Sequence, residues 1–337
     1  MPHTRPVVAI TLGDPASVGP EVVVKALATG ELHELCVPVV VGDPRAVERA
    51  LATTGAALRV VPVARPGAAT GEPGLAEVVD VPARGFDGIG WGRIQADAGR
   101  AAFESIRVAI GLALAREVDA VATAPVNKEA FRAAGVTQIG HTEIFGELTG
   151  TADPLTLFEV KALRIFFLTR HLSLAEAIGR ITADRTFDAL VRSAAALRTL
   201  GVASPRIAVA ALNPHGGEHG LFGDEEEREL APAVERARAA GIDARGPHPA
   251  DSVFWHAAEG RFDAVLSLYH DQGHVAAKMY DFERTVSITC GLPFLRTSVD
   301  HGTAFDIAGT GRANAVSMVE AVRAAARYAF AVRPRTG

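Results

Sequence analysis

Cysteine is scarce in this 337-residue sequence: Cys36 and Cys290 are the only two, and they lie far apart. They exclude a disulfide framework and a thiolate metal site. A formal net charge of −5 argues against binding to a nucleic-acid backbone. No apolar run reaches the roughly 20 residues of a membrane helix, and the N-terminal run does not resemble a signal peptide. We therefore expect a cytoplasmic protein that binds small molecules, with neither nucleic acid nor membrane as a partner.

Several common nucleotide-binding and catalytic motifs are also missing. The sequence has no G-x-G-x-x-G after an expected strand, no P-loop, no G-x-S-x-G elbow and no H-E-x-x-H pair. A dinucleotide, if one binds, must therefore bind without the usual glycine fingerprint.

What the sequence does contain is an alternation of short apolar runs and helical stretches. Runs such as PVVAITL and CVPVVVG are each followed by an Ala-rich helical segment. This alternation predicts an α/β fold with a mostly parallel sheet, and the length favours two domains. Residues 64–92, rich in Gly and Pro, are expected to form a loop or an antiparallel excursion, and residues 95–117 a long amphipathic helix.

Three of the expected strands are followed by a histidine. RIFFLTRH ends at His171, RIAVAALNPH at His215 and LSLYH at His270. Ligands bind beyond the carboxyl ends of parallel strands, and neutral imidazoles suit zinc, cobalt or iron. The pattern predicts a divalent metal site, in which Asp271 or Asp251 orients a histidine or acts as a base.

Two further clusters have both a structural and a functional interpretation. His141 and Thr142 precede a helical run, where Thr142 is either a helix cap or part of a substrate or phosphate site. Lys278 and Arg296 either clamp an anionic substrate or form ion pairs and surface charge. The residues alone leave both choices open.

Several long segments together carry a family resemblance. The segments are ITLGDPASVGPEVVVKAL, TAPVNKEAFRAAG, GHTEIFGELTG, LNPHGGEHGLFGDEE, YHDQGHVAAK and GLPFLRTSVDHGTAFDIAGTGRA. In this order, from about residue 7 to 325, they resemble the 4-hydroxythreonine-4-phosphate dehydrogenase family of vitamin B6 biosynthesis.

The resemblance implies an isocitrate/isopropylmalate dehydrogenase-like fold with two α/β domains flanking an active-site cleft. We accordingly divide the chain into a first domain, 1–125 plus 300–337, and a second, 126–299, which carries the metal ligands and the dimer interface. The implied protein is a homodimer whose partner completes the active site. The implied cofactors are NAD or NADP and a divalent metal, zinc or alternatively magnesium, cobalt or manganese.

The resemblance also assigns roles to individual residues. The metal ligands would be His171, His215 and His270, with His270 coming from the other subunit. The substrate would be bound by His141, Thr142, Lys278, Ser287 and Arg296, and the catalytic groups would be Lys278, Asp251 and His141. The implied reaction oxidises and decarboxylates a phosphorylated hydroxy acid, with 4-phosphohydroxy-L-threonine as the first choice.

Departures from the family pattern keep other substrates open. Ser287 stands where the family usually has asparagine, and Ser17 where it usually has glycine. The GDPA and YHDQGH variants look more like a second branch, which acts on D-threonate or D-erythronate 4-phosphate. The alternatives are a cis-dihydrodiol dehydrogenase of the terephthalate type, a metal-dependent hydrolase and a non-catalytic anion-binding protein.

Overall fold

The computed structural model describes residues 4–138 and 140–333. They form two compact units: unit 1 comprises Met1–Pro154 and Gly291–Gly337, and unit 2 comprises Leu155–Cys290. The first and the last described segments of the chain therefore both belong to unit 1, but the boundaries differ from those expected from the sequence.

The first boundary lies later than expected because the segment after residue 125 packs into the core of unit 1. Phe131, Ile144 and Phe145 of this segment are fully buried, in the same apolar cluster as Phe294. Removing three such side chains from water stabilises this packing by several kcal/mol, at about 1.5–3 kcal/mol each.

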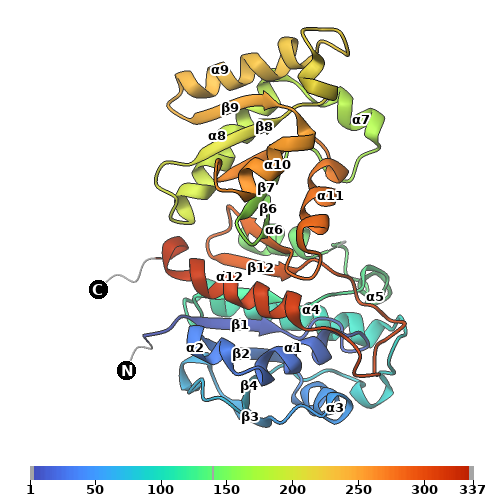
Figure 1. The fold of residues 1–337 in the computed structure, drawn as a ribbon. Coiled ribbons are helices and arrows are strands. Elements are labelled where there is room, and N and C mark those ends of the chain that lie inside the picture. Colours follow the sequence, from blue (N-terminus) through green and yellow to red (C-terminus); the bar gives the residue numbers. More distant parts are fainter. Residues whose placement is uncertain (1–3, 139, 334–337) are drawn as a thin grey trace. The chain divides into compact units, whose positions relative to one another are not determined.

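Unit 1 contains a parallel sheet with strand order β3-β4-β2-β1-β5-β12. Its strands are β1 (Val7–Thr11), β2 (Val37–Gly42), β3 (Arg59–Val63), β4 (Leu75–Asp80), β5 (Ala120–Thr123) and β12 (Leu295–Val299). Its helices are α1 (Gly19–Ala28), α2 (Glu31–Leu35), α3 (Pro44–Thr54), α4 (Ala96–Leu114), α5 (Lys128–Ala133), α6 (His141–Thr149) and α12 (Val316–Val332). Helices α4 and α12 pack on the central strands, which explains why β1 is apolar on both faces (Figure 1).

The Gly- and Pro-rich segment 64–92 does not form an antiparallel excursion. It contains β4, which pairs in parallel with both β2 and β3, so that expectation was wrong. The helix expected over residues 95–117 is observed as α4.

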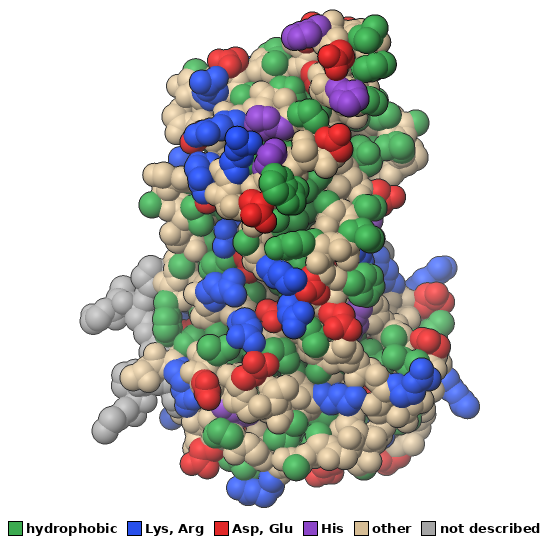
Figure 2. Space-filling model, viewed as in Figure 1, with side chains coloured by type: hydrophobic (Ala, Val, Ile, Leu, Met, Phe, Trp, Pro, Cys, Tyr) green, Lys and Arg blue, Asp and Glu red, His purple; other side chains and the backbone are tan. Residues whose placement is uncertain are grey.

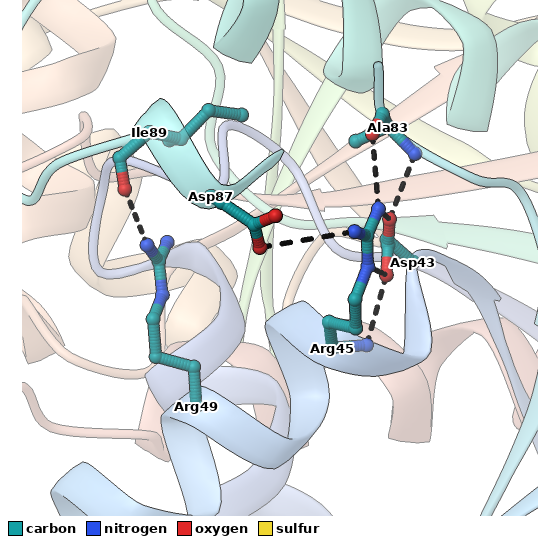
Figure 3. A network of polar contacts seen from close by, with 6 residues as sticks. All are labelled: Asp43, Arg45, Arg49, Ala83, Asp87 and Ile89. Carbon is teal, nitrogen blue, oxygen red and sulfur yellow. Dashed lines mark hydrogen bonds and ion pairs between the residues drawn. The ribbon is translucent and has the colours of Figure 1, made fainter. Parts of the chain in front are cut away.

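Helix α3 fixes two neighbouring segments of unit 1 (Figure 3). The Asp43 carboxylate caps the helix by accepting from the Arg45 amide at 2.9 Å and also accepts from the Ala83 amide at 2.8 Å. One turn later, the Arg49 guanidinium donates to the carbonyls of Ile89 and Pro15, each at 2.5 Å. The helix therefore holds the loop that follows β1.

Unit 2 has strand order β11-β6-β7-β10-β8-β9. Its strands are β6 (Leu155–Val160), β7 (Leu163–Phe167), β8 (Arg206–Ala210), β9 (Asp243–His248), β10 (Ala264–Ser267) and β11 (Val286–Cys290). Its helices are α7 (Leu174–Gly179), α8 (Ala183–Thr199), α9 (Ala231–Ala239), α10 (Ala250–Ala258) and α11 (His270–Asp281). The β11–β6 and β6–β7 pairs are antiparallel, whereas β7, β10, β8 and β9 run parallel. The expected α/β class with a mostly parallel sheet is confirmed.

The two cysteines are buried and lie in different units. Burial raises the pKa of both the Cys36 and the Cys290 thiol to about 12. Both thiols are therefore protonated at neutral pH and are poor nucleophiles. In the part of the chain that the structure describes, no helix combines the length and apolarity that crossing a bilayer requires.

Candidate active site

The three candidate metal ligands follow three neighbouring strands of unit 2. His171 follows β7, His270 begins α11 directly after β10, and His215 follows β8. Because β10 pairs in parallel with both β7 and β8, all three residues leave the sheet at the same edge. The expected placement at the carboxyl ends of parallel strands is therefore observed.

Two of these histidines line one cavity. This cavity, of about 320 Å³, is lined by Thr169, Arg170, His171, Leu172, Leu174, Ala177, Tyr269, His270 and Asp271. The ring centroids of His171 and His270 are 6.0 Å apart. A zinc–nitrogen bond of about 2.1 Å places a ring centroid roughly 3 Å from the ion, so this separation suits two imidazoles on one cation.

Asp271 is the carboxylate that orients His270. Its Oδ1 lies 2.6 Å from the Nδ1 of His270. Because a carboxylate only accepts, Nδ1 must carry the hydrogen, which leaves the lone pair on Nε2 for a ligand. The other candidate, Asp251, is exposed in the first turn of α10.

His274, which the sequence interpretation did not single out, supports His270 from the next turn of α11. The two rings are stacked, with centroids 3.6 Å apart and an interplanar angle of 11°. Phe158 and Phe167 contact the His274 ring, with centroids 4.4 and 4.7 Å away, and burial lowers the pKa of His274 to about 4. His274 is therefore neutral at pH 7.

The His270–His274 spacing is that of a helical chelating pair, but the stacking excludes this role. Imidazole lone pairs lie in the ring plane, so two rings stacked face to face cannot direct them at one ion between them. The i, i+4 spacing was the only signal in the sequence for His274, and it suggests the wrong role.

His215 lies apart from this pair. It is exposed, and the nearest ring is that of Phe222, 6.3 Å away between centroids. Within residues 4–138 and 140–333, no group of three or more His, Cys, Asp or Glu side chains converges at metal-binding distances. The structure thus brings together His171 and His270, but not His215.

Two of the three candidate metal ligands, His171 and His215, have a strained backbone. His171 has φ +45° and His215 has φ +54°, a conformation that costs a non-glycine residue about 1–3 kcal/mol. Strain of this kind is retained where the surrounding structure requires a particular side-chain direction.

Lys278 and Ser287 also lie in unit 2. Lys278 is eight residues after His270 on α11, so the two side chains point about 80° apart around the helix. Its Nζ lies 5.2 Å from the centroid of the Phe282 ring. Ser287 is half-buried in β11.

Arg296 is the buried cation of unit 1. Only 3% of its surface is exposed, and its Nη2 donates to the Thr123 hydroxyl at 2.6 Å. Burial lowers the pKa of Arg296 to about 9, although the Glu143 carboxylate acts in the opposite direction. The guanidinium is therefore charged at neutral pH in a site where charge is costly.

His141 lies close enough to Arg296 for its pKa to be affected. Burial, and then the charge of Arg296, hold the pKa of His141 well below 6.5. Its Nε2 is buried and has no hydrogen-bond partner among the described residues. A neutral imidazole with one unused nitrogen beside a buried cation is suited to bind a polar or anionic group.

Thr142 is not the cap of α6. The N-cap residue is Gly140, whose backbone is extended, and no side chain caps the helix. Thr142 instead lines a cavity of about 410 Å³ together with Glu143 and Glu147. Because the Glu143 and Glu147 carboxylates repel a phosphate, His141 is a better candidate than Thr142 for binding an anion.

Several known proteins are similar to this chain. Residues 34–325 match the family described as "Pyridoxal phosphate biosynthetic protein PdxA". A relative from Symbiobacterium thermophilum, provisionally named D-threonate 4-phosphate dehydrogenase, is 63% identical over 330 residues, which cover 98% of each chain.

Two solved structures of dehydrogenases are also similar to this chain. The crystal structure of 4-hydroxythreonine-4-phosphate dehydrogenase from Klebsiella pneumoniae is 42% identical, with a TM-score of 0.91 and coverage of 98% of this chain and 99% of that one. A terephthalate 1,2-cis-dihydrodiol dehydrogenase from Burkholderia xenovorans LB400 is more distant, at 29% identity, a TM-score of 0.64 and 97% coverage of both chains.

These relatives and the family establish the class of reaction. The expected enzyme, an oxidoreductase that acts on a CH–OH group with a nicotinamide cofactor, is confirmed at that level. The chain belongs to the PdxA family of pyridoxal phosphate biosynthetic proteins.

Proposed function

We propose that this protein is a metal-dependent NAD(P) dehydrogenase that oxidises and decarboxylates a 4-phosphorylated hydroxy acid. The observation that carries the proposal is the pair His171 and His270 in one cavity at the carboxyl ends of parallel strands. The metal, the substrate and the homodimer belong to the proposal, whereas the dehydrogenase class follows from the family.

The chemistry of three imidazoles suits a divalent cation, and of the three candidates the described residues bring together His171 and His270. His171, His215 and His270 would hold it, and Asp271 keeps the Nε2 of His270 free to do so. Zinc suits three imidazoles best, with cobalt, manganese or magnesium as alternatives. Bound there, such an ion supplies Lewis acidity to the hydroxyl group that is to be oxidised.

The chain's own residues account for binding and proton movement. Arg296 and His141, with Thr142, would hold an anionic end of the substrate and so keep the reacting carbon in place. Asp251 or Lys278 would accept the hydroxyl proton while the hydride passes to the nicotinamide. Carbon dioxide then leaves from the resulting β-keto acid, and the same groups can return a proton to the carbon left behind.

For the substrate we favour D-threonate 4-phosphate, because the 63% identical relative bears that name. The second candidate is 4-phosphohydroxy-L-threonine, which is named for the 42% identical structure. The two molecules differ at C2, where the first carries a hydroxyl and the second an ammonium group. D-Erythronate 4-phosphate is the stereochemical control.

The decisive experiment is a nicotinamide absorbance assay of the purified protein with NAD and with NADP against these three compounds. We expect turnover with D-threonate 4-phosphate and its loss after chelation. Turnover with 4-phosphohydroxy-L-threonine alone would assign the second substrate. No turnover with any phosphorylated acid, but activity on a cis-dihydrodiol, would overturn the proposal.

Variants in one loop test the ion. His215→Ala should lose metal-dependent turnover while keeping its fold. His219→Ala is the matched control, because His219 is exposed in the same loop and also has positive φ, at +56°. Full metal-dependent activity in His215→Ala would remove this residue from the ligand set.

The proposed homodimer is supported by an exposed apolar surface on unit 2. On α11 and directly after it, the exposed fractions are 59% for Val275, 81% for Met279 and 64% for Phe282. Figure 2 shows hydrophobic side chains at the surface in the region where Figure 1 labels α10 and α11. Large apolar groups at helical spacing, close to His270 and Lys278, suit contact with a second copy.

We place the activity in the cytoplasm, where two unpaired cysteines are stable.

A further inference from the structure

The loop that carries His215 has an unusual backbone. Positive φ values occur at His215, Gly216, Gly217, Glu218, His219, Gly220 and Gly223. The loop makes a few backbone hydrogen bonds of its own, such as Gly216 to Asn213 and Phe222 to Gly217, so contacts from outside must fix the rest of its conformation. A metal ligand on such a loop is only as well placed as those contacts make it.

The main contact comes from the buried side chain of Glu226, which is 3% exposed. Its Oε1 accepts from the backbone amides of Leu212 and Asn213, both at 2.7 Å. Its Oε2 accepts from the Asn213 side-chain amide at 2.9 Å. A carboxylate is rarely buried unless it is paired, and here the hydrogen bonds come from the residues that open the loop.

The far end of the loop packs on the same group. A Cβ atom added to Gly217 would lie 2.9 Å from the Oε2 of Glu226, and one added to Gly223 would lie 2.5 Å from the Nδ2 of Asn213. Both glycines also have positive φ. The loop therefore closes tightly around the Glu226–Asn213 pair from both sides.

We propose that Glu226, acting through Asn213, is the positioning residue that sets His215 to bind the divalent cation. The inference rests on the proposed metal site and extends it to a residue that does not itself touch the ion. Without this carboxylate, the backbone amides of Leu212 and Asn213 lose their acceptor. The Asn213 side-chain amide keeps only its 2.7 Å bond to the Glu225 carboxylate, so His215, two residues after Asn213, is no longer held in place.

The test measures Co²⁺ affinity of the metal-free protein by competition with a chromophoric chelator, so it does not depend on activity. Supporting groups around a metal ligand typically contribute about 10–100-fold to affinity, and we expect a loss in this range for Glu226→Ala. Glu226→Gln should recover most of the affinity, because its carbonyl can serve both backbone amides and the Asn213 amide can turn over.

The matched control is Glu229, a few residues further along the same segment. Its carboxylate accepts from the backbone amide of Ala183 at 2.8 Å, a bond to α8 rather than to the loop. Glu229→Ala should lower the melting temperature but change Co²⁺ affinity by less than about threefold. Should Glu226→Ala not fold, Asn213→Ala tests the same link and should also weaken Co²⁺ binding.

Two results would overturn the inference while the unsubstituted protein binds Co²⁺. One is an unchanged affinity in Glu226→Ala or in folded Asn213→Ala. The other is an equal loss in Glu229→Ala, which would show general destabilisation instead. If the unsubstituted protein binds no Co²⁺, the proposed metal site itself fails, and this result is distinct from the other two.

Discussion

Replacing Arg296 by methionine should make the protein more stable and its substrate binding weaker. Burial lowers the pKa of Arg296 from 12.5 to about 9. At about 1.4 kcal/mol per pKa unit, keeping this guanidinium charged in the folded state costs on the order of 5 kcal/mol. This cost is fully present below pH 9 and disappears only as the pH approaches 12.5, so an assay at pH 7 contains all of it.

Hydrogen bonds made by the Arg296 guanidinium offset part of this cost, so the measured gain in the free energy of unfolding should be smaller. Replacing buried charges with apolar side chains of similar volume typically stabilises a protein by about 1–4 kcal/mol, and we expect a gain in this range for Arg296→Met. The Thr123 hydroxyl keeps a partner, because it donates to the Thr297 carbonyl at 3.2 Å. Urea unfolding at pH 7 measures the change.

The same substitution should raise KM for the phosphorylated substrate. A hydrogen bond to a charged group contributes about 1.5–3 kcal/mol, which corresponds to roughly 10–150-fold in KM. The change should fall mainly on KM, because the anionic end is bound in the ground state as well as in the transition state.

Arg164→Met is the matched control and should have the opposite effect. Arg164 donates to the buried Glu159 carboxylate at 2.9 Å, so the substitution leaves an uncompensated charge and destabilises by on the order of 3 kcal/mol. It should leave KM unchanged. If Arg296→Met also destabilises the protein and leaves KM unchanged, Arg296 is a structural residue and the anion site is wrong.

The remaining predictions concern Asp14, the two cysteines and helix α11. Burial raises the pKa of Asp14 from 3.8 to about 6, so the folded protein disfavours the charged carboxylate. The stability that goes with the neutral carboxyl is complete below pH 4 and is lost as the pH rises through 6. Asp14→Asn should therefore stabilise the protein at pH 8, by at most about 3 kcal/mol, and an equal gain at pH 4 would contradict this. Cys36 and Cys290 should react with a disulfide reagent only after unfolding, and rapid reaction of the native protein would refute their burial. Met279→Asp should convert the proposed dimer to a monomer by light scattering, whereas Leu114→Asp, at an exposed site of unit 1, should not. Dimer formation by Met279→Asp would exclude this face as the interface.

Sequence patterns predicted the local features of this protein well. Alternating apolar runs and helical stretches predicted the α/β class, because a strand covered on both faces is mostly apolar, as is β1, whose residues are all buried. The histidines that end three such runs predicted their common edge, since parallel strands end on one side of a sheet. Segment 64–92 was misjudged because its Gly and Pro content concealed the short strand β4.

Contacts between residues distant in sequence could not be predicted in this way. Nothing near Phe131 or Phe145 indicates that they pack with Phe294, and this packing moved the unit boundary. Likewise, the sequence analysis did not single out His274, and only the stacked ring planes showed that it supports His270.

The sequence by itself determined the fold class, the family and the residue types available for chemistry, because these depend on local periodicity and on short motifs. Tertiary structure alone decided which side chains are buried and which groups they meet. The residues alone left Arg296 as either an anion clamp or an ion-paired or surface charge, and only the fold shows that it is buried with its pKa lowered to about 9. Glu226 reads as one of a run of acidic residues, yet folding places its carboxylate against Asn213 at the start of the His215 loop. Burial and long-range hydrogen bonding depend on the whole fold, and no short stretch of sequence contains them.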